Sequence, residues 1–96
     1  MATLFISHSV VLQSIAYSTD THEICYVFLV DGIEKRLTGE LHEALGIKGI
    51  KCSDELEQFL LALMPMDRNV SKKLSSISWA YAEGEGVELP IPLLGL

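Results

Sequence analysis

The sequence predicts an α+β fold, in which an antiparallel sheet of three to five strands carries two or three helices packed mainly on one face. Three observations lead to this fold. Strand-forming runs alternate with polar turns up to residue 38, a helical period extends from residue 53 to residue 82, and the last ten residues form another apolar stretch. A chain of 96 residues supports one hydrophobic core, so we expect a single domain over residues 1–96.

The first half of the chain predicts a β-meander with strands at residues 10–17, 23–30 and 33–38. The polar segment STDTH separates the first two strands, and Asp31-Gly32, a preferred dipeptide of the type I′ turn, separates the last two. Residues 4–6 are expected to add a short strand before the meander. The turns set the expected neighbours: Val30 with Ile33, Phe28 with Lys35, Tyr26 with Leu37, Leu12 with Phe28, and Ile15 with Cys25.

Two helices are expected after the meander. The segment GELHEALG, residues 39–46, predicts one or two helical turns that Gly46 closes in a left-handed conformation. A longer helix is expected over residues 54–64, because Ser53 is a favourable N-cap and Pro65 disfavours continuation. Its apolar residues recur at helical spacing: Leu56, Phe59, Leu60 and Leu63.

The segment that follows Asp67 fits two structures. With Asp67 as N-cap, the apolar positions over residues 70–81 predict a third helix, whereas Ile77, Trp79 and Tyr81 alternate with small residues as in a strand. We favour the helix because its pattern is longer. In that helix Trp79 lies nearly opposite the buried stripe, where either neighbouring elements or a partner protein would cover it.

The C-terminal segment VELPIPLLGL is too apolar to remain in water. Pro90 and Pro92 are two residues apart, so in an extended chain their missing amides lie on one edge while the other edge can still pair. We therefore expect residues 87–93 to form an edge strand, either of this chain's own sheet or of the sheet of a second copy. The alternative is a polyproline-like tail that lies in a groove.

The second face of the predicted sheet is unusually apolar. The middle strand has apolar residues on both faces, and helices from so short a chain would cover one face only. The other face is therefore expected to bind a dimer mate or another protein, unless the N-terminal strand or the tail covers it. Its predicted apolar members are Val11, Ile15, Tyr17, Cys25, Val27 and Leu29, with Gln13, Glu34 and Arg36 among them.

Composition limits the class of partner. Seven basic and thirteen acidic residues give a net charge of −6, which argues against direct binding to nucleic acid. Hydrophobic residues make up 49% of the chain and the mean hydropathy is +0.33, which favours an apolar surface that meets a partner. No run is long enough to span a membrane, and no signal peptide is evident. With only two cysteines, we expect a cytoplasmic protein with reduced thiols.

No motif predicts catalysis, a metal or a cofactor. On a strand, His22 and Cys25 would point to opposite faces, and on a helix the adjacent His42 and Glu43 would not face each other. We therefore expect that the protein is not an enzyme and has no cofactor.

The predicted function is that of a small acidic binding module, which acts as an inhibitor, adaptor or regulator of another protein. By analogy of size and charge, we expect such a module to be encoded by a phage or mobile element and to be directed at a host defence protein. A nucleic-acid-binding protein with a basic surface is the expected partner. We expect a homodimer. The alternative is a small-molecule-binding or minor catalytic domain whose pocket draws on Tyr26, His42 and Cys52. The predicted partner-binding residues are Val11, Ile15, Tyr17, Val27, Leu29, Trp79, Glu83 and Glu85.

Overall fold

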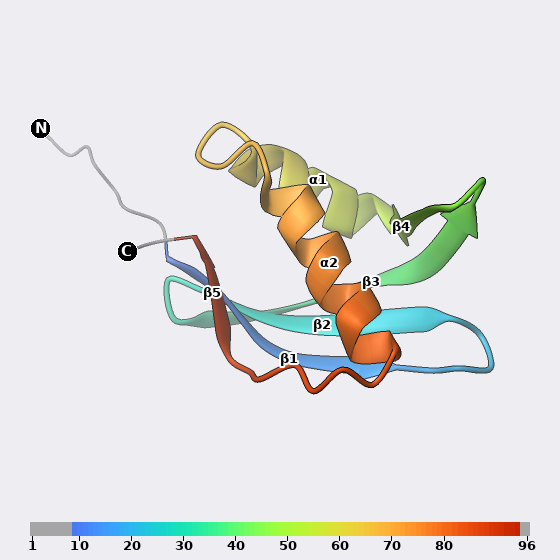
Figure 1. Cartoon of the computed structure of the whole chain (residues 1–96). Coiled ribbons are helices and arrows are strands. Elements are labelled where there is room, and N and C mark those ends of the chain that lie inside the picture. Colours follow the sequence, from blue (N-terminus) through green and yellow to red (C-terminus); the bar gives the residue numbers. More distant parts are fainter. Residues whose placement is uncertain (1–8, 95–96) are drawn as a thin grey trace, which may run out of the picture.

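The protein has an α+β fold (Figure 1), and the computed structural model describes residues 9–94. Within this range the chain forms a five-stranded antiparallel sheet and two helices, as the sequence predicts. The strand order is β4-β3-β2-β1-β5, and both helices pack on one face. The expected strand at residues 4–6 lies outside the described residues. The elements are β1 (Val10–Tyr17), β2 (Glu23–Val30), β3 (Ile33–Ala44), β4 (Ile47–Cys52), α1 (Asp54–Leu63), α2 (Val70–Ala82) and β5 (Ile91–Leu94).

The β2–β3 hairpin confirms the prediction from Asp31-Gly32. Both turn residues have positive φ, 52° at Asp31 and 85° at Gly32, as a type I′ turn requires. Three expected pairs are therefore observed: Val30 with Ile33, Phe28 with Lys35, and Tyr26 with Leu37.

The β1–β2 pairing contains a bulge that the sequence did not reveal. Leu12 pairs with Phe28 as expected, but the register then shifts between Leu12 and Ser14, and Ile15 pairs with Tyr26 instead of Cys25. An extra residue on one strand reverses the face to which the following side chains point. Ile15 is consequently buried in the core and Tyr17 packs against it, so their expected position on the second sheet face is wrong.

The short helix expected at residues 39–46 is also wrong. Strand β3 continues to Ala44, and a second two-residue turn, Leu45-Gly46, leads into β4. Gly39 and Leu41 are buried while the residues between and after them are exposed, which is the two-residue period of a strand. The positive φ of Gly46 therefore serves a hairpin turn and not a helix end.

Helix α1 begins and ends as the sequence predicts. The Ser53 hydroxyl accepts a hydrogen bond from the amide of Leu56 at 3.2 Å, which satisfies one of the free amides of the first turn. The helix ends at Leu63, two residues before Pro65.

Helix α2 confirms the helical alternative for the segment around Trp79. It begins after Asn69, so the expected N-cap at Asp67 is wrong. The Asp67 carboxylate instead accepts a hydrogen bond from the Asn69 amide at 2.9 Å and pairs with Lys73. These contacts lower the pKa of Asp67, chiefly through the Lys73 hydrogen bond.

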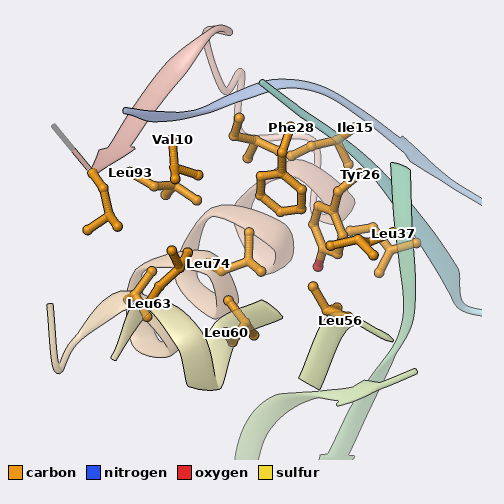
Figure 2. Close-up of a cluster of buried hydrophobic side chains, with 14 of the residues drawn as sticks. Val10, Ile15, Tyr26, Phe28, Leu37, Leu56, Leu60, Leu63, Leu74 and Leu93 are labelled. Carbon is orange, nitrogen blue, oxygen red and sulfur yellow. The ribbon is translucent and has the colours of Figure 1, made fainter. Parts of the chain in front are cut away.

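The core lies between the sheet and the helices (Figure 2). Within it, the Phe28 and Phe59 ring centroids are 4.8 Å apart. Ser78, which is fully buried, is satisfied because its hydroxyl lies 2.6 Å from both the Tyr26 hydroxyl and the Leu74 carbonyl. Burial raises the pKa of Tyr26, and the hydrogen bond to Ser78 partly opposes this.

The tail forms the predicted edge strand, although it is shorter than expected. Pairing of β5 with β1 begins at Ile91 rather than at residue 87. Leu93 and Leu94 are buried, and Leu89 packs against the same core. The tail therefore completes the helix-covered side of the sheet.

Candidate protein-interaction surfaces

The sheet face opposite the helices is the first candidate surface, and we call it the open face. Within residues 9–94 no helix covers it. The tail residues Leu89, Leu93 and Leu94 pack into the core on the other side of the sheet. Its apolar side chains are half-buried by their own neighbours. They are Val11, Cys25, Val27 and Leu29.

Polar side chains border the apolar part of the open face. Arg36 is paired with Val27 across the strands, and Glu34 with Leu29. The two charged residues form an ion pair at 2.8 Å. Of the residues predicted for this face, Val11, Val27 and Leu29 are there, whereas the bulge moves Ile15 and Tyr17 to the core side.

The β3–β4 hairpin is the second candidate surface. It projects away from the helices, at the end of the sheet opposite to the β2–β3 turn (Figure 1), and the molecule is elongated, with extents of 49 × 25 × 20 Å. At its apex Leu45 is 100% exposed and Ile47 is 73% exposed. Sequence reasoning missed both residues, because Leu45-Gly46 is not a usual turn dipeptide.

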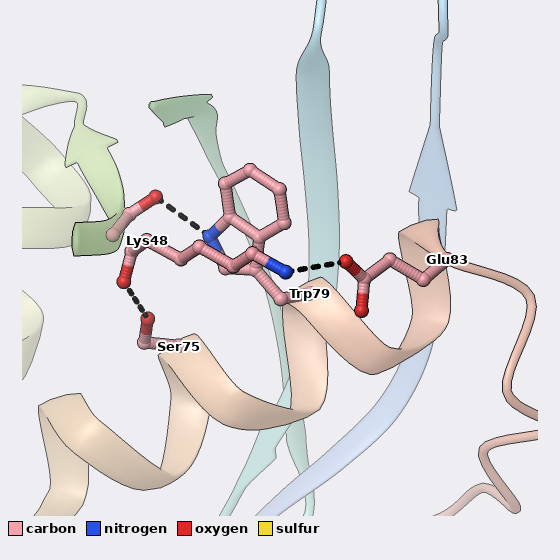
Figure 3. A network of polar contacts seen from close by, with 5 residues as sticks. Lys48, Ser75, Trp79 and Glu83 are labelled. Atoms are coloured by element: carbon pink, nitrogen blue, oxygen red, sulfur yellow. Dashed lines mark hydrogen bonds and ion pairs between the residues drawn. The ribbon is translucent and has the colours of Figure 1, made fainter. Parts of the chain in front are cut away.

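A polar network fixes the start of β4, close to the apex of this hairpin, to α2 (Figure 3). The Trp79 indole N–H donates to the carbonyl of Gly49 at 3.0 Å, and the Ser75 hydroxyl donates to the carbonyl of Lys48 at 3.4 Å. The Lys48 ammonium lies 5.3 Å from the Trp79 ring centroid and donates to Glu83 at 2.7 Å. The half-buried Trp79 therefore holds β4 in place from one side of the hairpin.

Acidic residues surround Lys48. The hydrogen bond and charge of Glu83 raise the pKa of Lys48, and the charges of Glu43 and Glu85 add to this effect. The same bond to Lys48 lowers the pKa of Glu83. Three of the predicted partner-binding residues, Trp79, Glu83 and Glu85, thus gather around the start of β4 and not on the open face.

The residues proposed for a small-molecule pocket do not come together. Tyr26 is fully buried and bonded to Ser78, and His42 is exposed on the face opposite to the core. Cys52 lines a surface depression of about 230 Å³ between β4 and the helices, together with residues such as Leu60. The structure therefore gives no support to the pocket alternative.

The surroundings of Cys52 favour its protonated form. Burial raises the pKa of the Cys52 thiol, and the charge of Glu57 adds to this, which disfavours the nucleophilic thiolate. Among residues 9–94, no three His, Cys, Asp or Glu side chains form a possible metal site. Neither of the helices described is long and apolar enough to cross a bilayer.

Comparison with known proteins shows a relative that matches over nearly the full length of the chain. No protein-family model matches the sequence. The chain is 35% identical over 95 residues to an Escherichia coli O1:K1:H7 protein named Cysteine protease immunity 1, and the match covers 99% of each sequence.

Proposed function

This chain belongs to the family of Cysteine protease immunity 1, and on this basis we propose that it is an immunity protein that binds a cysteine protease and blocks its activity. The observation that carries the proposal is the 35% identity across 99% of both sequences. A match of this extent includes every strand and helix of the fold, and so every surface through which such a protein would act.

The chemistry of the chain supports the role of inhibitor over that of protease. A cysteine protease needs a thiolate that a neighbouring histidine activates. Here the Cys52 thiol is stabilised in its protonated form, and His22 is bonded to the Tyr17 hydroxyl at 3.0 Å. We therefore retain the prediction that the protein is not an enzyme.

Two surfaces are available for the protease. The open face offers Val11, Val27 and Leu29, and the surface around Lys48 of β4 offers Glu83 and Glu85. An apolar patch with charged residues nearby is the usual composition of a protein interface, since the apolar part supplies affinity and the charges guide association.

The location of the protein in the cell stays a prediction. We propose action in the cytoplasm, where the free thiols of Cys25 and Cys52 would stay reduced. An origin in a phage or mobile element and a nucleic-acid-binding partner likewise stay predictions. The family relationship favours a cysteine protease as the partner instead.

The test is direct inhibition. Each cysteine protease encoded in the source genome would be produced and assayed on a peptide substrate with increasing amounts of this protein. We expect one protease to lose nearly all activity at a one-to-one ratio, and cells that produce it to survive when this protein is co-produced. A serine protease is the control and should be unaffected. If none of the cysteine proteases is bound or inhibited, the proposal is wrong.

A further inference from the structure

Leu45 occupies a conformation that its side chain disfavours. Its φ is +54°, in the left-handed region where leucine is uncommon, and its side chain is 100% exposed. A type I′ turn prefers asparagine, aspartate or glycine at this position. Neither the turn geometry nor the core therefore accounts for a leucine here.

The β2–β3 hairpin provides an internal comparison. It uses the same two-residue turn with positive φ at both positions, but has Asp31-Gly32 in place of Leu45-Gly46. The Asp31 carboxylate accepts a hydrogen bond from the Ser9 amide at 2.8 Å, so that turn is stabilised by its side chain. The fold can thus form this turn with a favourable residue, and the leucine at the β3–β4 apex has another role.

The apex is apolar, and the strand next to it is attached to α2. A single exposed leucine is ordinary, but here Ile47 is 73% exposed next to it on a projecting hairpin. Trp79 bonds to Gly49 and Glu83 bonds to Lys48, the two residues of β4 that directly follow Ile47. An anchor that is already ordered loses less conformational entropy on binding.

We infer that the apex of the β3–β4 hairpin, with Leu45 and Ile47 as anchors, inserts into an apolar pocket of the cysteine protease that this chain is proposed to neutralise. The inference rests on the proposed function. The hairpin projects as a convex element, which fits a concave site. Because three carboxylates, Glu43, Glu83 and Glu85, lie around Lys48 beside the apex, the matching pocket carries basic residues at its rim.

Leu45→Asn separates binding from folding. Asparagine tolerates positive φ and makes the turn Asn-Gly, so the variant should unfold at the same temperature as the wild type or higher. Binding is measured with a protease whose catalytic cysteine has been replaced, so that nothing is cleaved. The affinity of the variant for this protease should fall about 30-fold or more, as expected for an interface anchor. Both quantities are measured on the full chain, by thermal unfolding and by calorimetry.

Ile47→Asn and Ile33→Asn form a matched pair. Each isoleucine directly follows the glycine of a type I′ turn, and the two are 73% and 72% exposed. They lie at opposite ends of the sheet, on the order of 35 Å apart along β3. Ile47→Asn should weaken binding about tenfold or more, whereas Ile33→Asn should leave it unchanged.

The outcomes are distinct. Wild-type binding together with loss of affinity in Leu45→Asn and Ile47→Asn supports the inference. Wild-type binding with unchanged affinity in Leu45→Asn overturns it and leaves the proposed function intact. If the wild type binds no cysteine protease, both fail. If the free protein is a dimer that Leu45→Asn dissociates, the apex contacts a second copy and the inference is wrong.

Discussion

Ser78 is a polar residue at the centre of the core. It is fully buried, yet it costs little because it donates to the Leu74 carbonyl and lies within bonding distance of the Tyr26 hydroxyl. The Tyr26 phenol gains this partner but loses its contact with water, which disfavours the phenolate and raises its pKa. Burial acts in the same direction on the Cys52 thiol.

We predict that the protein loses stability in alkaline solution through these two groups. Their folded-state pKa values are raised, so the unfolded chain releases its protons first as the pH increases. The stabilising contribution is complete below the unfolded pKa values, about 9 for the thiol and about 10 for the phenol, and is lost above them. The melting temperature, followed by circular dichroism, should fall between pH 9 and pH 11.

Tyr26→Phe tests how much of the alkaline loss of stability comes from the Tyr26 phenol. The variant should be less stable by about 1 kcal/mol at neutral pH, because a buried hydrogen bond is lost. Its melting temperature should then fall less between pH 9 and pH 11 than that of the wild type. An identical alkaline slope in both proteins would contradict this explanation.

Gly39 and Gly49 lie on neighbouring strands, but only one has room for a side chain. A Cβ at Gly39 would lie 3.0 Å from the Ile50 side chain and 3.2 Å from that of Leu56, whereas a Cβ at Gly49 would meet nothing within 4 Å. Gly39→Ala should therefore destabilise the protein by about 1–3 kcal/mol, while Gly49→Ala should stabilise it by about 0.5 kcal/mol. Chemical denaturation measures both, and equal effects would contradict the observed packing of α1 on β3.

At the level of elements, two two-residue turns decide where β2, β3 and β4 meet. The Asp31-Gly32 turn sets the β2–β3 register, and the Leu45-Gly46 turn lengthens β3 to twelve residues and adds β4 as an edge strand. The other edge is β5, in which Pro92 has no amide to donate. Both edges are thus protected against pairing with another chain, β5 by its proline and β4 by its contacts with α2.

We predict that β5 is required for the fold. Deletion of every residue after Gly86 removes Leu93 and Leu94 from the core and exposes the edge of β1. Each buried leucine contributes about 1.5–3 kcal/mol, so the truncated chain should lose more than about 3 kcal/mol of stability and aggregate. Size-exclusion chromatography and thermal unfolding measure this. A truncated protein that stays soluble and equally stable would show that the tail has no structural role.

For the molecule as a whole, the helices cover only one face of the sheet. The open face has an apolar centre of Val11, Val27 and Leu29 that Glu34 and Arg36 border. The free energy of the system falls when a partner covers such an apolar centre and removes it from water. Either a protease or a second copy of this chain would satisfy that requirement.

Val27→Lys tests whether the open face binds a partner. The new ammonium would lie opposite Arg36 and would be buried without a counter-charge in any complex, so association should weaken about tenfold or more. Light scattering measures self-association, and calorimetry measures binding to the protease. Leu61→Lys, on the outer side of α1 where Leu61 is 51% exposed, is the control and should change neither. A strictly monomeric wild type whose Val27→Lys variant binds the protease equally well would exclude the open face.

The sequence by itself determined the elements whose patterns are local. Asp31-Gly32 predicted the β2–β3 turn and its register, Ser53 and Pro65 predicted the limits of α1, and the apolar spacing predicted α2. In each case the deciding interactions join residues only a few positions apart, so a short segment contains the physical information that is needed.

The tertiary structure alone decided the rest. Residues 39–46 have good helix formers, yet they extend β3 because pairing with β4 and packing of Leu56 over Gly39 stabilise the strand. The bulge in β1 is set by the pairing with β2, which moves Ile15 into the core. The cluster at the start of β4 joins Lys48 to Glu83 and Gly49 to Trp79, residues 35 and 30 positions apart. Contacts between segments so distant in the chain form only on folding, so no local sequence pattern predicts them.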